Sequence, residues 1–182
     1  MVKIVQKENP VLRKISKEVD ISDITKPKIQ KLLKDMSEAL HSQDDGVAIA
    51  APQIGKSLRI FMVSGRIFDE DFIQNGNLAK NDSYKGPYHP DLVFINPTLK
   101  KISKDKKLTD EGCLSIRPIF GKVLRATKAT IEAYNEKGEK ITRGASGLLA
   151  QIFQHETDHL EGILFTDMAK ELYDVLPPKA DD

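Results

Sequence analysis

Hydrophobic side chains recur with regular spacing in several stretches of the chain, and these stretches predict its main elements. Over residues 26–41 they recur at helical spacing, which predicts a helix with Pro27 in its first turn. The apolar runs at residues 58–63 and 92–95 predict two strands, the second of them closed by Pro97. The amino-terminal half is therefore expected to combine one amphipathic helix with buried strands.

A hairpin and a second helix are predicted in the carboxy-terminal half. Residues 129–134 and 140–142 flank the turn residues 135–138, an arrangement typical of a β-hairpin. A helix is expected to begin near Ser146, a favourable amino-terminal cap, and to end at Gly162. Strands in hairpins and grouped helices indicate an α+β fold, with antiparallel β-sheets and hairpins around this second helix.

Two segments show no such pattern. Residues 65–90 are rich in Gly, Asn, Asp and Lys and are predicted to form an exposed loop. Beyond Phe165 the chain is expected to be briefly helical at best, because Pro177 and Pro178 end any helix in the short tail at residues 168–182. We expect residues 1–182 to form one domain, which at this length buries enough surface to fold without disulfides.

Composition and charge argue against several classes of protein. Lys and Arg number 28 against 27 Asp and Glu, and a net charge of +1 does not favour direct binding of nucleic acid. No apolar run approaches the ~20 residues of a membrane span, and the alternating amino terminus does not resemble a signal peptide. A single cysteine excludes an internal disulfide and favours a reducing compartment, so we expect a cytoplasmic protein.

The second predicted helix carries an H-E-x-x-H pattern formed by His155, Glu156 and His159. At about 100° per residue, both histidines share a stripe with Leu148 and Ile152. The polar side of the same helix carries Gln151, Gln154, Asp158 and Glu161. Two neutral imidazoles one turn apart can bind one metal ion, with Glu156 beside the metal-bound water. Histidines satisfied within the core are the alternative, but their pairing on one amphipathic helix favours the metal.

A third ligand is needed, because catalytic metal sites usually combine three protein ligands with one open position. No histidine follows His159, and His41 and His89 lack a comparable context and are expected at the surface. Cys113 by itself is typical of a small buried hydrophobe. Its neighbours in the segment EGCLS, Gly112 and an acidic residue, are unusual in an ordinary core.

Residues 46–53, with the sequence GVAIAAPQ, form a third unusual segment. Its small residues let backbone or ligand approach closely, and Gln53 ends it with an amide donor. By itself the segment is more typical of a tight turn and strand with a solvent-facing glutamine. Together, however, GVAIAAPQ, EGCLS and QHETDH occur in the order and approximate spacing of three motifs of the peptide deformylase family. The chain resembles this family from its amino-terminal helix to about Asp167.

This resemblance implies a metal-dependent hydrolase that removes the formyl group from the N-terminal formylmethionine of new polypeptides and releases formate. It implies that Cys113, His155 and His159 bind one divalent metal ion, Fe²⁺ in the cell, with Zn²⁺, Ni²⁺ or Co²⁺ as substitutes. It further implies that Glu156 acts as general acid and base. Gln53, by its side chain, and Leu114, by its backbone N–H, would donate hydrogen bonds to the developing oxyanion.

Substrate contacts are expected around the same segments. By family position and helical phase, Val47, Leu148 and Ile152 are predicted to form the methionine pocket, although each is also typical of ordinary core. The predicted substrate-binding set is completed by Gly46, Ala48 and Gly112.

Two features depart from the family pattern. Ala48 stands where glycine is usual, and its methyl is expected to narrow the channel in which substrate runs as an added strand. Arg117-Pro118 stand where Pro-Gly is common.

Two other functions are kept as alternatives, and contact with the ribosome is expected to be weak. An H-E-x-x-H peptidase would leave EGCLS without a role, and a catalytically silent relative would bind formyl peptides or a structural metal. The expected partners are N-formylmethionyl nascent peptides. Some members of the family dock on the ribosome through a basic carboxy-terminal helix, whereas this tail is short and acidic. We therefore expect at most a transient ribosome contact.

Overall fold

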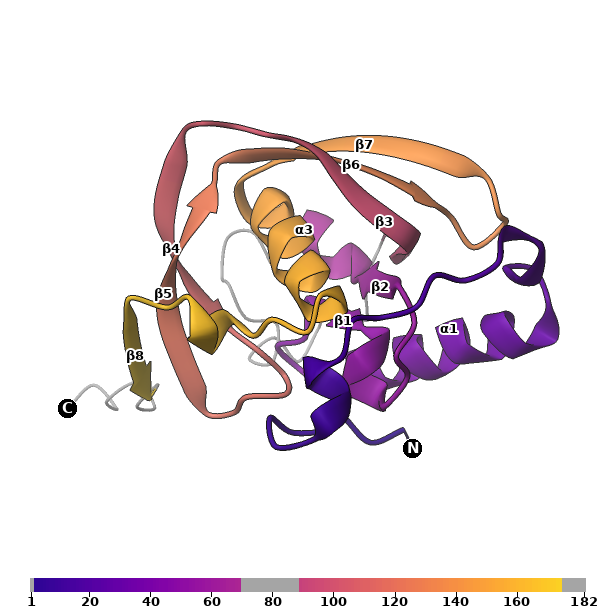
Figure 1. Ribbon diagram of the computed structural model, residues 1–182, viewed down its shortest axis with the longest axis horizontal. Coiled ribbons are helices and arrows are strands. Elements are labelled where there is room, and N and C mark those ends of the chain that lie inside the picture. Colours follow the sequence, from indigo (N-terminus) through magenta and orange to yellow (C-terminus); the bar gives the residue numbers. More distant parts are fainter. Residues whose placement is uncertain (1, 70–88, 175–182) are drawn as a thin grey trace.

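The computed structural model describes residues 2–69 and 89–174, and in it two antiparallel sheets lie on either side of helix α3 (Figure 1). The larger sheet has the strand order β1-β2-β3-β6-β7, and the smaller sheet has the order β4-β5-β8. This combination confirms the predicted α+β class. The helices and strands of the described residues are α1 (Pro27–His41), β1 (Ala48–Ala50), β2 (Ile60–Val63), β3 (Leu92–Ile102), β4 (Lys106–Gly112), β5 (Ile119–Ala126), β6 (Lys128–Tyr134), β7 (Lys140–Ser146), α3 (Gly147–Leu160) and β8 (Glu171–Asp174).

Helix α1 packs its apolar stripe against the larger sheet. The stripe predicted over residues 26–41 is at most 7% exposed in the structure, at Ile29, Leu32, Leu33, Met36 and Leu40. It forms one core cluster with residues of β1, β2 and β3. Pro27 begins the helix as predicted, where its missing N–H costs little.

Helix α3 lies between the two sheets and contacts strands of both (Figure 1). Phe153 is fully buried and its ring lies 5.1 Å from that of Phe94 and 6.2 Å from that of Phe61, between centroids. The helix ends before Gly162, which has a φ of 73° as expected for a glycine cap. No helix in the described ranges is long and apolar enough to cross a bilayer.

The predicted hairpin is confirmed, whereas strand β3 is longer than predicted. Strands β6 and β7 pair in register from Tyr134 opposite Lys140 to Lys128 opposite Ser146. Strand β3 does not stop at Pro97 but continues to Ile102. Its pairing with β6 is irregular at this point, so the missing N–H of proline does not interrupt a regular ladder.

The predicted exposed loop at residues 65–90 is wrong at its start, and residues 70–88 lie outside the described residues. Gly65–Phe68 form a short helix, η4, whose first three residues are buried. Ser64 caps this helix by accepting a hydrogen bond from the Arg66 backbone N–H. Gly65 fits because it has no side chain, since a Cβ there would lie 1.8 Å from the backbone oxygen of His89.

The whole smaller sheet was missed by sequence analysis. Strands β4 and β5 bury charged residues and expose apolar ones: Glu111 and Arg125 are at most 5% exposed, whereas Leu108 and Leu124 are more than 40% exposed. Val123 is buried as usual, but these four exceptions interrupt the apolar–polar alternation of a half-buried strand, so the sequence pattern predicted no strand here. The tail also differs from the prediction, because β8 extends the chain as a strand paired with β5.

Candidate metal centre and substrate cleft

Three potential metal ligands from two distant segments meet beside α3. Cys113 follows β4, whereas His155 and His159 lie one turn apart on α3. One ligand atom from each residue lies within 4.8 Å of the other two, and Cys113 Sγ is 3.2 Å from His159 Nε2. The two imidazole rings are 4.9 Å apart between centroids, at an interplanar angle of 74°. One sulfur and two nitrogens at these separations can converge on a single ion.

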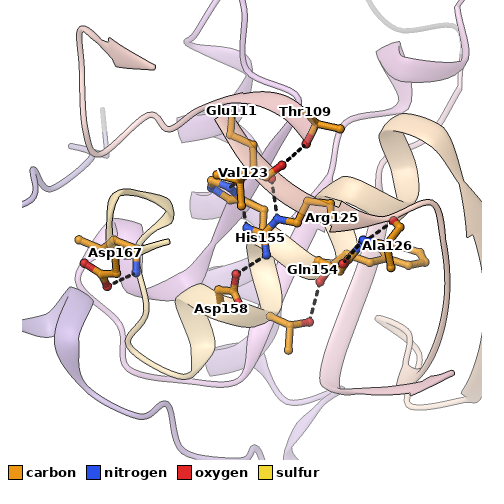
Figure 2. A network of polar contacts seen from close by, with 12 residues as sticks. Thr109, Glu111, Val123, Arg125, Ala126, Gln154, His155, Asp158 and Asp167 are labelled. Atoms are coloured by element: carbon orange, nitrogen blue, oxygen red, sulfur yellow. Dashed lines mark hydrogen bonds and ion pairs between the residues drawn. The ribbon is translucent and has the colours of Figure 1, made fainter. Parts of the chain in front are cut away.

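A buried ion-pair network orients the first of these histidines (Figure 2). Glu111 Oε2 lies 2.9 Å from His155 Nδ1, so that the other ring nitrogen is left to face Cys113. Arg125 donates to both oxygens of Glu111, at 2.6 and 2.9 Å, and to Asp158 at 2.6 Å. A carboxylate on the outer nitrogen of a ligand histidine fixes the ring and its tautomer. The network therefore holds the His155 ring in one orientation, with its other nitrogen toward Cys113.

The network also shifts the pKa values of its members. Burial by itself would raise the pKa of Glu111, but hydrogen bonds from Arg125 and His155 outweigh it and lower that pKa to about 2. Burial lowers the pKa of His159 well below its ordinary value, so this imidazole is neutral. Burial also opposes protonation of His155, but the contacts with Cys113 and Glu111 dominate and raise its pKa. A metal ion bound at His155 would therefore have to displace a proton.

Glu156 is a buried carboxyl beside the three potential ligands. It is 4% exposed, and its Oε2 has no hydrogen-bond partner among the described residues. Burial raises the pKa of Glu156 to about 7. A carboxyl with a pKa near neutrality can both take and return a proton at the same pH.

Gln53 reaches the same place from the larger sheet. It is 2% exposed, not solvent-facing, and lies in the short helix η3 (Ala51–Ile54) that follows β1. Its Oε1 accepts from the Ala50 backbone N–H at 2.8 Å, which orients the amide. Its Nε2 then points toward Cys113 Sγ, at 3.4 Å, and Ser115 Oγ, at 3.3 Å.

A cavity of about 820 Å³ opens beside these groups. It is lined by Cys113, His155, Glu156 and Gln53 and by five of the six predicted substrate-binding residues, namely Val47, Ala48, Gly112, Leu148 and Ile152. Leu114 also lines it, whereas Gly46 is buried and does not. Leu148 is 42% exposed and lies at the open side, so it is not ordinary core.

The polar side predicted for the second helix is only partly exposed. Gln154 is 8% exposed and both accepts from and donates to the backbone of Ala126, at 3.0 Å in each direction. Asp158 pairs with Arg125. The smaller sheet covers this side of α3, which the helical period does not reveal. His41, expected at the surface, is half-buried and lies 2.8 Å from Asp91, whereas His89 is exposed.

A sulfur, two imidazoles, a buried carboxyl and an amide donor around one cavity are the groups that a metal-dependent hydrolase uses. Comparison with known proteins identifies the particular family. A family model described as polypeptide deformylase matches residues 1–174. The chain is 38% identical to peptide deformylase 2 of Clostridium acetobutylicum over 164 residues, which cover 90% of this chain and 92% of that protein. It is 41% identical to a peptide deformylase of Desulfitobacterium hafniense over 169 residues, which cover 92% and 94%.

Solved structures agree. A class I type b peptide deformylase from Acinetobacter baumannii, crystallised with Met-Ala-Ser, superposes with a TM-score of 0.76 at 28% identity, covering 92% of this chain and 98% of that one. The peptide deformylase of Thermotoga maritima gives 0.75 at 30% identity, covering 94% and 99%. The chain belongs to the peptide deformylase family, metalloenzymes that remove the N-formyl group from nascent polypeptides. The comparisons support neither the peptidase nor the silent relative.

Sequence analysis missed one functional residue and undervalued another. Glu111 was noted only as an unusual neighbour of Cys113, although it holds His155. Arg125 gave no signal, because it lies 14 residues beyond Glu111 and only the pairing of β4 with β5 brings the two together.

Proposed function

We propose that Cys113, His155 and His159 hold one divalent metal ion and that Glu156 carries the proton in formyl hydrolysis. The convergence of the three ligand atoms within 4.8 Å is the observation that carries this proposal. His159 Nδ1 is buried without a hydrogen-bond partner among the described residues, while its Nε2 faces the sulfur. Sulfur and two nitrogens make three ligands, which leaves one position open as in catalytic sites.

The metal supplies Lewis acidity, which makes water a better nucleophile at neutral pH. Glu156 takes the proton of the attacking water and returns it to the nitrogen that leaves when the formyl C–N bond breaks. Its buried carboxyl, with a pKa of about 7, suits both transfers. The donor set is compatible with Fe²⁺, Zn²⁺, Ni²⁺ or Co²⁺, and we propose Fe²⁺ in the cell from the family resemblance.

Two donors are proposed to stabilise negative charge on the formyl oxygen. Gln53 Nε2 is held toward the ligands by the hydrogen bond that its own Oε1 accepts from Ala50. The backbone N–H of Leu114 makes no hydrogen bond within the described part of the chain. Donors fixed before the reaction stabilise charge as it develops, and losing one typically costs about 10²–10³ in rate.

The methionine side chain is proposed to occupy the apolar part of the cavity, against Val47, Leu148 and Ile152. Ala48 and Gly112 line the same cavity, and the backbone N–H of Gly46 closes the turn before β1 by donating to the Gln43 carbonyl at 3.1 Å. A Cβ at Gly112 would lie 2.5 Å from the Phe120 ring, so this position allows close packing that another residue would disturb.

Formate release from formyl-Met-Ala-Ser tests the proposal. Met-Ala-Ser is the peptide bound in the Acinetobacter baumannii relative, and the assay is run anaerobically with added Fe²⁺ or Ni²⁺. We expect formate and free Met-Ala-Ser in equal amounts. Cleavage of an internal peptide bond, or binding of the peptide without formate release, would contradict it.

Replacing Cys113 by serine is expected to remove most of the bound metal. A neutral hydroxyl is a much poorer ligand than a thiolate. The loss in affinity should exceed the roughly 10–100-fold that follows loss of an outer partner of a metal ligand. Metal content after gel filtration measures this, with His89→Gln, an exposed histidine outside the cluster, as the control. Unchanged metal in Cys113→Ser would show that this sulfur is not a ligand.

We further propose one domain over residues 1–182, a cytoplasmic location and no stable ribosome docking through the tail. Residues 171–174 form β8 on the smaller sheet, which removes them from any docking helix. Ribosome co-sedimentation that depended on residues after Leu172 would contradict the docking proposal. Recovery in exported or membrane fractions would contradict the location.

A further inference from the structure

An ion pair joins two walls of the cavity at its solvent-exposed rim. Arg117 Nη2 lies 2.5 Å from Asp45 Oδ1, and the two side chains are 44% and 48% exposed. Asp45 immediately precedes the segment 46–53, and Arg117 lies just beyond the segment 111–115. Both line the same cavity as the proposed metal ligands, although the two residues are 72 positions apart in the chain.

Because this pair lies at the exposed rim, it is placed to contact the part of a substrate that leaves the cavity. The formyl end belongs at Cys113 and Glu156, which are less exposed, and the methionine side chain belongs at the apolar lining. A nascent chain continues for many residues, so it has to leave the cavity across the exposed rim. A chain that leaves between the segments that carry Asp45 and Arg117 brings its charged side chains after the methionine within reach of this pair.

We propose that Asp45 and Arg117 determine the charge specificity for the substrate residues that follow methionine, an inference that rests on the proposed deformylase site. Exposed ion pairs add little stability, so a charged substrate side chain can replace either partner. An acidic side chain contacts Arg117 and a basic one contacts Asp45. Because the two charges cancel in the pair, the native enzyme accepts both kinds of substrate.

A second exposed ion pair, which has one cavity-lining member, provides a matched control. Asp110 also lines the cavity, and its Oδ1 lies 2.8 Å from Lys122 Nζ and accepts from the Tyr173 hydroxyl. Lys122 itself does not line the cavity. Removing its charge frees an acidic group at this other place, which matters only if the substrate leaves there.

The experiment compares kcat/KM for amidated peptides that differ only in one charged residue. The peptides are formyl-Met-Glu-Ser and formyl-Met-Lys-Ser, and formyl-Met-Ala-Glu and formyl-Met-Ala-Lys. They are assayed with the metal-loaded native protein and with Asp45→Asn, Arg117→Gln and Lys122→Gln. In Asp45→Asn the unpaired guanidinium should raise the Glu/Lys ratio about two- to fivefold, and Arg117→Gln should lower it by a similar factor. Both effects should shrink at ~1 M salt, where the Debye length falls to about 3 Å.

The ratio separates this inference from the function on which it rests. A Glu/Lys ratio that stays native in both single variants would overturn the specificity proposal, even if every peptide is deformylated. A shift in Lys122→Gln as large as in Arg117→Gln would also overturn it, because the substrate would then leave past Asp110. Failure of the native protein to release formate from neutral formyl-Met-Ala-Ser would instead contradict the proposed function.

Discussion

Replacing Glu156 by glutamine is expected to reduce formate release by roughly 10²–10⁴-fold while the metal stays bound. The amide keeps the shape of the side chain but cannot accept the proton of the attacking water. Glu156 is 4% exposed and lines the cavity together with His155 and Cys113. Glu111, another buried carboxyl that lines the cavity, is already engaged by Arg125 and His155.

The measurement is formate production together with metal content on the same preparation. Glu161→Gln is the matched control, because Glu161 lies at the end of the same helix and pairs with Arg59 away from the cavity. This control should retain activity close to that of the native protein. If Glu156→Gln kept its metal and turned over within a few-fold of native, Glu156 would not be the proton carrier.

Replacing Arg125 by methionine is expected to lower the free energy of unfolding by about 3–5 kcal/mol. Methionine preserves much of the apolar volume but leaves the carboxylates of Glu111 and Asp158 without their common partner. Arg125 and Glu111 have side chains that are 6% and 2% exposed, so water cannot replace the guanidinium at low cost. The orientation of His155 also depends on Glu111, and metal affinity should fall by about 10–100-fold.

Urea unfolding of the metal-free and metal-loaded proteins measures both effects. Arg13→Met is the matched control, because its pair with Asp167 is 48% and 37% exposed and should contribute only about 0–1 kcal/mol. Arg125→Lys should be intermediate, since lysine restores the charge but not the two parallel hydrogen bonds. A loss in Arg125→Met no larger than in Arg13→Met would contradict a structural role for Arg125.

The same unfolding experiment tests the domain organisation. A native protein that unfolds in two separate transitions would contradict the proposed single domain.

Local sequence patterns predicted the helices and strands in which the spacing of apolar residues matches the face that is buried. The stripe of α1 and the β6–β7 hairpin are of this kind, because each buries one regular face or turns at a strong turn sequence. Strands β4 and β5 could not be predicted in the same way. Their buried positions include Glu111 and Arg125, whose burial is tolerable because they pair with each other and with His155 and Asp158 of α3.

The amino-acid sequence by itself determined which chemical groups are present and that two histidines and a glutamate share one helical segment. That spacing is local, so the 3.6-residue period is enough to place His155 and His159 together. Only the tertiary structure decided that Cys113 and Gln53 meet them, and that Asp45 reaches Arg117 across the rim. These contacts join residues tens of positions apart. They depend on how two sheets pack around α3, which no periodicity within one segment specifies.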